Sequence, residues 1–310
     1  MSSSMKVREA REDELDFLIK KAEENLPHSL TIHGALSIGF RRNIYSRSYS
    51  KIYIPEDDSL PFFIIITGII IKNRPNMTLY WNPEEIPREV ARELLLSLPH
   101  WSWDEPFIIY SGWTPVLLET EKIVTGENSI SKKLIFGLGN YGYCYGLGTK
   151  FSTPTIPRSE FVLAPLTEKD AELVHKNWIY NCAEDVESIR RNIESLPSMA
   201  AYEKILSSEQ ENKNNNMESF TDKPISWALT RPYGEVGFNF TFPEHRCKGL
   251  SGAVTKELVK KLIEDGITPF VNVTGENPAS VKAIENIGFI KCSSFGYQYY
   301  WFPEMQLSEF

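Results

Sequence analysis

The sequence has few features of secreted, metal-binding or membrane-spanning proteins. Its 310 residues include only four cysteines, which are far apart in the chain: Cys144, Cys182, Cys247 and Cys292. Their spacing matches no metal-ligand motif and gives no disulfide framework, so we expect reduced thiols and no metal. The most apolar stretch, residues 61–71, is roughly half the ~20 residues that a helix needs to cross a bilayer, so no membrane association is expected.

Basic residues are also scarce relative to acidic ones. Lys and Arg number 33 against 41 Asp and Glu, which gives a formal net charge of -8. Nucleic-acid binding usually requires a basic face, so nucleic acid is not an expected partner, although a few local cations suffice for a small anion. The N-terminus lacks the apolar segment of a secretory signal and becomes acidic by Glu9, so we expect a cytoplasmic protein. A mitochondrial location stays open, and nothing in the sequence indicates an oligomeric state.

Length and patterning predict an α/β protein of two domains. The hydrophobic content of 42% is that of a folded chain, and 310 residues are enough for two ordinary domains. Pro, Ser and Thr gather in residues 149–159, so we place the domains at residues 1–155 and 156–310. In the first, apolar periodicity predicts helices at 7–24 and 83–98, the second capped by Asn82, and strands at 30–40, 51–54, 61–71, 77–81, 107–111 and 133–136.

The second half has a clearer pattern. Residues 207–219 have almost no apolar side chains and predict a surface loop. Helices are expected at 167–177, 185–195, 248–264 and 278–286. Strands are expected at 161–164, 200–206, 270–274, 289–293 and 297–302, together with a hairpin of strands 224–230 and 235–242 that turns at 231–234.

The clearest chemical signal is the segment between the predicted strand 235–242 and helix 248–264. Gly249 and Gly252 lie at the start of the helix, where backbone N–H groups lack intrahelical partners and the helix dipole is positive. Arg246 and Lys248 add charge, and Ser251 offers a hydroxyl donor. This arrangement suits a pyrophosphate, although an ordinary capped helix gives a similar pattern.

Two motifs resemble those of the GNAT acyltransferases. Arg246-x-x-Gly249-x-Ser251 resembles their pyrophosphate motif, Arg/Gln-x-x-Gly-x-Gly/Ala, with Ser251 departing from it at the third position, and Asn277-x-x-Ser280 followed by Gly288-Phe289 resembles their next helix. The resemblance implies a GNAT fold in the second half and acyl-CoA or acetyl-CoA as co-substrate. It implies contacts with that co-substrate from Phe240, Thr241, Phe242, Arg246, Cys247, Lys248, Gly249, Leu250, Ser251, Gly252, Asn277 and Ser280.

A closer resemblance is to the glycine N-acyltransferase family. Residues 24–39, 174–181 and 226–236 are similar to segments of that family, in which the N-terminal half is itself a diverged GNAT-like unit. The resemblance implies transfer of an acyl group from a CoA thioester to the amine of a small acceptor such as glycine or another amino acid. A protein or polyamine acceptor is a further possibility.

The resemblance assigns the general base to Glu235, which stands eleven positions before Arg246. An ammonium must lose a proton before it can attack a thioester carbonyl, and a carboxylate at the start of the strand could accept it. Glu235 could instead be a solvated residue at the end of the turn. His245 could also act as the base, but both His245 and Glu244 are more typical of turns. The family's usual general-acid Tyr is replaced by Ile284, so either the thiolate leaves without an acid or Tyr297 or Tyr299 serves.

Two further readings follow from the residues. Phe238, Phe240 and Phe242 alternate along the predicted strand and should pack into the core. Residues 137–142 match Gly-x-Gly-x-x-Gly, but no amphipathic helix follows, so we interpret them as β-structure rather than a dinucleotide site. The alternative to an enzyme is a non-catalytic CoA-binding module, favoured by Ile284 and Ser251.

Overall fold

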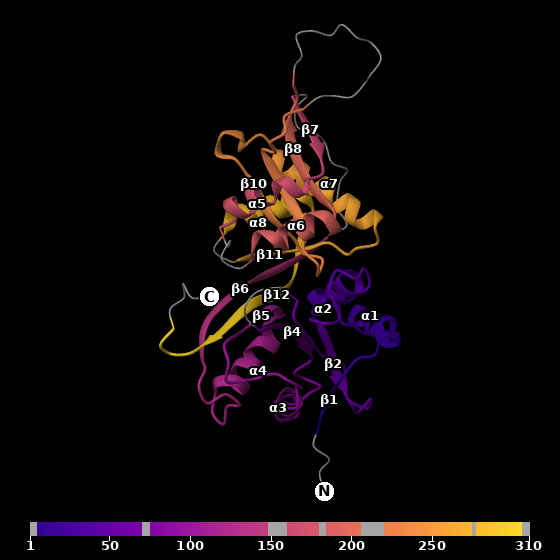
Figure 1. Ribbon diagram of the computed structural model, residues 1–310, viewed down its shortest axis with the longest axis vertical. Helices are drawn as coiled ribbons and strands as arrows, with labels where there is room; N and C mark the ends of the chain where they lie inside the picture. Colours follow the sequence, from indigo (N-terminus) through magenta and orange to yellow (C-terminus); the bar gives the residue numbers. More distant parts are fainter. Residues whose placement is uncertain are drawn as a thin grey trace. The chain divides into compact units, whose positions relative to one another are not determined.

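The computed structural model describes residues 5–69, 75–147, 160–179, 184–205, 220–274 and 277–305. The chain divides into two compact units (Figure 1). Unit 1 consists of residues 1–146, 272–278 and 291–310, and unit 2 of residues 147–271 and 279–290. We expected two continuous domains that meet near residue 155; instead, two segments of the second half pack with the first.

Unit 1 is built on a mixed sheet in the strand order β1-β2-β3-β4-β5-β12-β6-β11. Neighbouring strands from β1 to β4 pair antiparallel, and so do β5 and β12. Strands β4 and β5 pair in parallel. The strands are β1 Val7–Glu9, β2 Lys51–Pro55, β3 Phe63–Thr67, β4 Asn76–Trp81, β5 Phe107–Trp113, β6 Ile135–Leu147, β11 Phe270–Thr274 and β12 Phe289–Trp301. The helices are η1 Glu12–Glu14, α1 Leu15–Glu24, α2 Leu30–Gly34, the π-helix η2 Ala35–Phe40, α3 Arg88–Leu96 and α4 Thr114–Thr125.

Helices cover both faces of the unit 1 sheet. Ile64, Ile65 and Ile66 are all fully buried in β3, although successive side chains of a strand point to opposite faces. Ile65 packs with the buried side chains of α3 and α4 in one apolar cluster. On the other face Tyr80 donates a hydrogen bond from its hydroxyl to Asn25 Oδ1 at 3.1 Å, next to the end of α1. Burial on both sides explains why these strands are continuous apolar runs.

The predicted strand at 30–40 is wrong, because this segment is helical from α2 through η2. Nearly all of its side chains are buried, so the apolar residues run together and the helical period is hidden. The structure also contains α4, which the sequence did not predict. The Ser-Gly pair at 111–112 and Pro115 at the helix start mark the boundary between β5 and α4, and the prediction did not use these signals.

Two other helices in unit 1 begin later than predicted. Residues 7–9 form β1 and pair with β2, so helix α1 starts only at Leu15. The helix expected from residue 83 starts at Arg88, immediately after Pro87. Asn82 does not cap it, since its side chain accepts a hydrogen bond from the Glu84 amide at 3.1 Å within the preceding turn.

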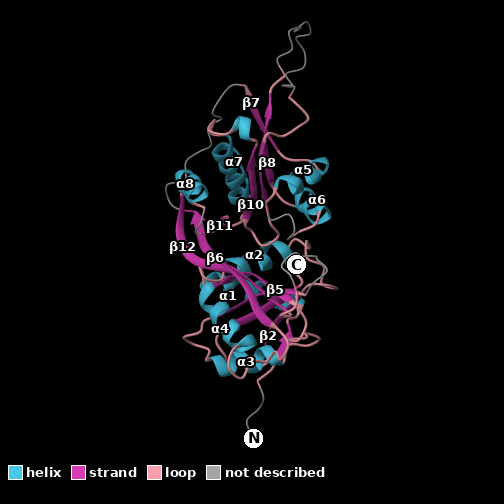
Figure 2. Cartoon of the chain, turned by 90° about the vertical axis from the view of Figure 1, so that its left-hand side faces the viewer, coloured by secondary structure: helices cyan, strands magenta, loops and turns pink. Residues whose placement is uncertain are grey.

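Unit 2 is built on an antiparallel four-stranded sheet in the order β10-β9-β8-β7. Helices α5 and α6 cover one face and α7 the other (Figure 2). Thr167 and Asp170 form a capping box before α5, and the Asp185 side chain caps α6. The strands are β7 Phe161–Ala164, β8 Ser198–Glu203, β9 Ser226–Thr230 and β10 Val236–Thr241. The helices are η3 Glu168–Asp170, α5 Ala171–Asn177, α6 Val186–Ser195, η5 Pro243–His245, α7 Leu250–Glu264 and α8 Pro278–Ile287.

The same order of elements occurs twice along the chain. Strand, two helices, three strands, helix, strand, helix and strand run from β1 to β6 and again from β7 to β12. The two closing strands that we predicted form the single strand β12, because the pairing with β5 only shifts register between Gly296 and Gln298 instead of turning. Residues 137–142 lie in β6, as the β-structure interpretation predicted. No helix in the described part of the chain is long and apolar enough to cross a membrane.

Candidate functional site

Strand β10 is interrupted by a β-bulge. Val236 and Gly237 pair with Thr230 and Leu229, but the pairing then shifts, and Phe240 faces Trp227. The bulge residue Phe238 has a φ of 54°, a left-handed conformation that is rare for an aromatic residue. A bulge leaves one residue outside the ladder. Strand β10 is also the edge strand of its sheet, so within the described residues no strand of this sheet lies on its other side near Phe238.

The aromatic side chains of β10 hold the bulge in place. Phe238 packs on Trp178 with ring centroids 4.5 Å apart, and Phe240 stacks on Trp227 at 4.9 Å. Phe242 meets Trp227 edge-on at 5.8 Å. All three phenylalanines belong to the apolar cluster that α5 and α6 cover. The prediction that they pack into the core is confirmed.

The N-terminus of α7 has the geometry of an anion-binding site. Gly249 precedes the helix with a φ of 79°, and Cys247 has a φ of 60°. No side chain caps the helix, and within the described residues the amides of Leu250, Ser251 and Gly252 donate no hydrogen bond. A Cβ added at Gly252 would meet nothing within 4 Å, so space is open beside the first turn. Unsatisfied donors, the positive helix end and open space thus coincide.

Two basic side chains flank this helix start. Arg246 is exposed and donates from Nε to the Thr241 carbonyl at 3.1 Å, which leaves the rest of its guanidinium at the surface. Lys248 Nζ lies 3.4 Å from His245 Nδ1. His245 therefore belongs to the loop of η5, as expected of a turn residue, and Glu244 beside it is exposed.

The Ser251 side chain makes a hydrogen bond within the protein. Its hydroxyl donates to Asn239 Oδ1 at 2.9 Å, and Asn239 Nδ2 donates to Thr255 Oγ1 at 2.7 Å. These bonds tie the bulge of β10 to the first turns of α7. The Ser251 hydroxyl is thus engaged with the protein, and its backbone amide is the group open to a ligand.

Glu235 lies at the start of β10 in a buried charged cluster. Its carboxylate Oε2 is 3.4 Å from Nε of Arg231, and Arg231 also forms an ion pair with Glu184. All three residues are less than a tenth exposed. The Arg231 guanidinium also lies over the rings of Trp178 and Phe238, with its Cζ 5.0 and 4.5 Å from the ring centroids. Glu235 is therefore not the solvated turn residue of the alternative interpretation.

At Glu235, β10 separates from β11, the strand on the side away from β9. Its carbonyl accepts a hydrogen bond from the Arg231 amide at 2.8 Å, which closes the β9–β10 turn. Glu235 also forms an isolated parallel bridge with Phe270, the first residue of β11. Beyond this bridge the two strands belong to different sheets.

Sequence reasoning missed Arg231 and Glu184. Arg231 stands in an Arg-Pro-Tyr-Gly turn, a setting typical of exposed residues, and Glu184 is distant in sequence. The only available signal was that a buried carboxylate requires a cation nearby.

The remaining predicted residues are spread over both units. Ser280 is half-buried on α8 in unit 2, and Ile284 is buried there. Asn277 is exposed and lies in the segment 272–278, which packs with unit 1. Tyr297 and Tyr299 of β12 are half-buried and also belong to unit 1. The choice between the two tyrosines as general acid stays a prediction.

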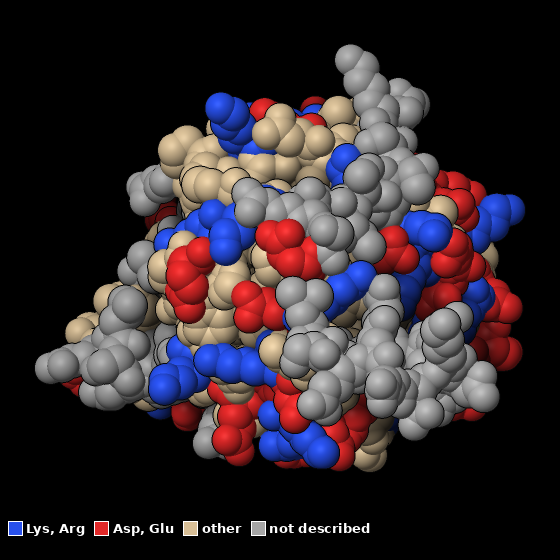
Figure 3. Space-filling model, turned by 90° about the horizontal axis from the view of Figure 1, so that it is seen from above, with Lys and Arg blue, Asp and Glu red and all other residues tan. Residues whose placement is uncertain are grey.

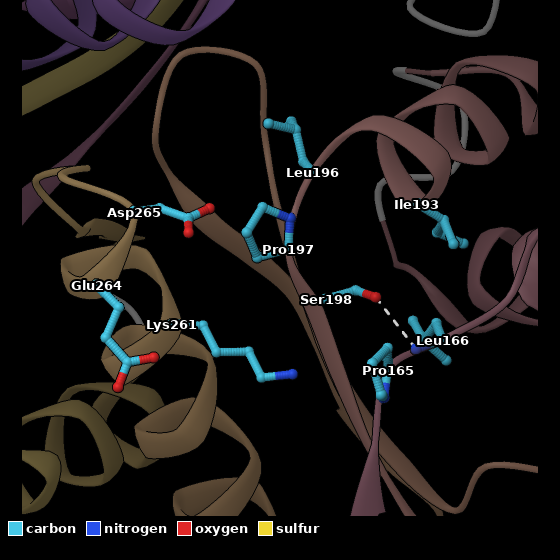
Figure 4. A pocket seen from close by; sticks show the side chains of 9 residues that line it. All are labelled: Pro165, Leu166, Ile193, Leu196, Pro197, Ser198, Lys261, Glu264 and Asp265. Carbon is cyan, nitrogen blue, oxygen red and sulfur yellow. Dashed lines mark hydrogen bonds between the residues drawn. The ribbon is translucent and has the colours of Figure 1, made fainter.

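A pocket of about 280 Å³ in unit 2 lies away from these residues, by the C-terminal end of α7 (Figure 4). Lys261 reaches across it toward Ser198 and Pro165. Its walls contain none of the predicted site residues. The residues that line it are Pro165, Leu166, Ile193, Leu196, Pro197, Ser198, Lys261, Glu264 and Asp265.

Over the face of the molecule in Figure 3, acidic and basic side chains are interspersed.

Comparisons with known proteins found a matching family model and a curated relative. A family model described as FR47-like protein matches residues 217–302. Human glycine N-acyltransferase-like protein 1 is 26% identical over 190 residues, which are 61% of this chain and 55% of that protein. The match therefore spans about half the length of the curated relative.

Solved structures resemble nearly the whole chain. A Drosophila protein solved by a structural genomics consortium has a TM-score of 0.71 at 14% identity, covering 94% of this chain and 97% of its own. A tandem GNAT protein from the clavulanic acid biosynthesis pathway has a TM-score of 0.56 at 10% identity, covering 97% and 99%. The chain has a GNAT fold. The predicted fold class and the resemblance to GNAT proteins are confirmed.

A tandem GNAT fold explains the repeated order of elements. A tandem GNAT protein aligned over its full length accounts for both halves of this chain. At 10–14% identity these solved structures show the fold, and the activity of the chain is a matter for proposal. Acceptor, co-substrate and catalytic base remain for proposal.

Proposed function

We propose that this protein is an N-acyltransferase that moves an acyl group from a CoA thioester to the amine of a small acceptor, such as glycine or another amino acid. The observation that carries the proposal is the bulge of β10 followed by the uncapped start of α7. One continuous segment thus offers main-chain groups for an extended ligand and an anion site where that ligand would end.

The start of α7 fits a pyrophosphate. Three amides without partners in the described structure point out of the helix start, and Gly249 and Gly252 leave the approach free of side chains. Arg246 and Lys248 supply positive charge to offset the phosphates. We assign the pyrophosphate of CoA to this loop, held by residues 246–252.

The outer edge of β10 fits the arm of CoA that leads to the thioester. This arm contains amide groups, which can bond to the main chain of an edge strand as a neighbouring strand would. Residues 240–242 connect the bulge to the phosphate loop. A backbone N–H near the bulge could then donate to the thioester carbonyl and stabilise the negative charge that develops as the amine attacks.

Glu235 is the proposed general base. It would take a proton from the ammonium form of the acceptor, and the neutral amine nitrogen would then attack the thioester carbonyl carbon as the CoA thiolate leaves. The ion pair with Arg231 holds the Glu235 carboxylate at the start of β10. The two carboxylates and one guanidinium of the cluster sum to one negative charge.

A second candidate function is CoA binding without catalysis. It is favoured by Ile284, whose buried side chain occupies the position of the family's general acid.

The test is thiol release from acetyl-CoA and from benzoyl-CoA, each with glycine and a panel of small amines, followed by mass spectrometry of the product. An acylated amine would establish the reaction and identify the acceptor. Saturable CoA binding with no product for any acceptor would favour the non-catalytic module. Absence of any CoA binding would refute both.

Two variants separate catalysis from binding. Glu235→Gln should lower kcat roughly 10²–10⁴-fold, the usual contribution of a general base, and leave CoA affinity unchanged. Glu244→Gln is the matched control, because Glu244 is exposed on the same strand–loop–helix segment and should change neither. Equal turnover by Glu235→Gln and the wild type would reject Glu235 as the base.

A further inference from the structure

Two cysteines that have no part in the proposed site lie side by side in unit 1. Cys144 is in β6 and Cys292 in β12, which are neighbours in the sheet. Cys292 Sγ lies 3.4 Å from the Cys144 carbonyl oxygen, and the two thiols are hydrogen-bonded to each other. Lys291 Nζ lies 3.0 Å from the centroid of the Tyr143 ring. Because successive side chains alternate between faces, the two thiols share one face of the sheet, and Lys291 and Tyr143 share the other.

The two thiols differ in accessibility, and Cys292 is more acidic than an ordinary thiol. Cys144 is fully buried, whereas Cys292 is partly exposed. The hydrogen bond from Cys144 is the main cause that lowers the pKa of the Cys292 thiol to about 7. A thiol with this pKa is substantially ionised at neutral pH, and the thiolate is the form that attacks disulfides.

The Cys292 thiol lies beside a glycine of β6. Gly146, two residues after Cys144 on β6, has no side chain, and a Cβ there would lie 3.4 Å from Cys292 Sγ. An attacking thiolate needs an open approach to its partner sulfur. The pair therefore combines an accessible nucleophile with a buried thiol in contact with it.

We propose that Cys144 and Cys292 form a reversible disulfide, and that this pair is a modification site for small-molecule disulfides such as oxidised glutathione. The Cys292 thiolate attacks one glutathione sulfur, which forms a mixed disulfide and releases one glutathione thiolate. Cys144 then loses its proton and attacks the Cys292 sulfur, which releases the second glutathione. Two protein thiols are oxidised, and one glutathione disulfide is reduced to two thiols.

The cross-link would close a large loop. The two cysteines are 148 positions apart, and the sequence between them includes all of unit 2. Closing a long loop restricts the unfolded chain, so the oxidised protein should melt at a higher temperature than the reduced one. In a reducing compartment the pair would stay as thiols, and it would respond when the ratio of oxidised to reduced glutathione rises.

The experiment uses the full chain with Cys182→Ser and Cys247→Ser, so that only the pair remains. After incubation with oxidised glutathione, thiol counting and intact mass should show both thiols lost with no glutathione retained, and dithiothreitol should restore both thiols. Adding Cys144→Ser should stop the reaction at one glutathione per chain on Cys292. Adding Cys292→Ser should leave Cys144 unreacted.

Stable glutathione on Cys292 while Cys144 is intact would overturn the proposal, as would failure of both thiols to react. If the background variant does not fold, non-reducing peptide mapping of the oxidised wild type gives the same answer through the Cys144–Cys292 cross-linked peptide. The result does not depend on the acyltransferase assignment, because no step involves CoA.

Discussion

Replacing Arg231 by Met tests the buried charged cluster of unit 2. The substitution keeps an apolar side chain against Trp178 and Phe238, but it removes the cation that contacts Glu184 and Glu235. Removing one partner of a buried ion pair typically costs about 3–5 kcal/mol, because a charge is left buried without compensation. For a protein of this size the melting temperature should fall by roughly 10 °C.

Thermal unfolding followed by circular dichroism measures this effect, and two comparisons assign its cause. Arg190→Met removes a partly exposed ion pair with Glu187 and should change the free energy of unfolding by less than about 1 kcal/mol. Adding Glu184→Gln and Glu235→Gln to Arg231→Met should recover most of the lost stability, because the buried carboxylates are then neutral. A melting temperature for Arg231→Met within about 2 °C of the wild type would refute the reasoning.

Two further predictions concern unit 1. Tyr300 is fully buried and stacks on Phe107 with centroids 4.6 Å apart, so Tyr300→Ala should cost about 3–5 kcal/mol in urea unfolding, and a loss below about 1 kcal/mol would contradict the packing of β12. The hydrogen-bonded Arg8 guanidinium lowers the pKa of Glu14 from 4.5 to about 2. This folded-state pKa is depressed, so the stabilisation is present above pH 4.5 and is lost as the pH falls toward 2. Because the pair is partly exposed, Arg8→Gln should cost about 1–2 kcal/mol at pH 7, with the difference closing between pH 4.5 and 2; identical unfolding curves at pH 7 would disprove it.

The elements predicted best are those whose ends are marked by proline or glycine. The β9–β10 hairpin and α7 were predicted within two residues, because a Pro-Tyr-Gly turn and a glycine at the helix start mark their limits. The helical segment 30–40 was mistaken for a strand, because burial on almost all sides removes the period that distinguishes the two.

The candidate site was predictable only in part. The motif at 246–251 identified the loop before α7, since Gly249 is needed at a left-handed φ. The bulge at Phe238 was not readable, because nothing in an aromatic residue indicates a positive φ. Glu235 and Glu184 both form an ion pair with Arg231, and tertiary packing brings Glu184 to this cluster from a distant part of the sequence.

In the described part of the chain, the anion-site features at the start of α7 have no counterpart at the equivalent position before α3. The loop between β4 and α3, residues 82–87, reads Asn-Pro-Glu-Glu-Ile-Pro and has neither glycine nor a basic residue. Strand β4 pairs with β3 in unbroken register from Phe63↔Trp81 to Thr67↔Met77, whereas β10 has a bulge. The described loop 82–87 and strand β4 of unit 1 thus have neither the loop chemistry nor the bulge on which the proposed CoA site of unit 2 depends.

Strand β12 sits between β5 and β6 in the sheet of unit 1, although it is the last strand of the chain. During synthesis on the ribosome, β5 and β6 emerge long before the strand that separates them. The first half therefore cannot acquire its native sheet until the second half has been translated, and until then β5 has an open edge available for wrong pairing. A premature stop codon near residue 290 would consequently damage the part of the protein that was made first.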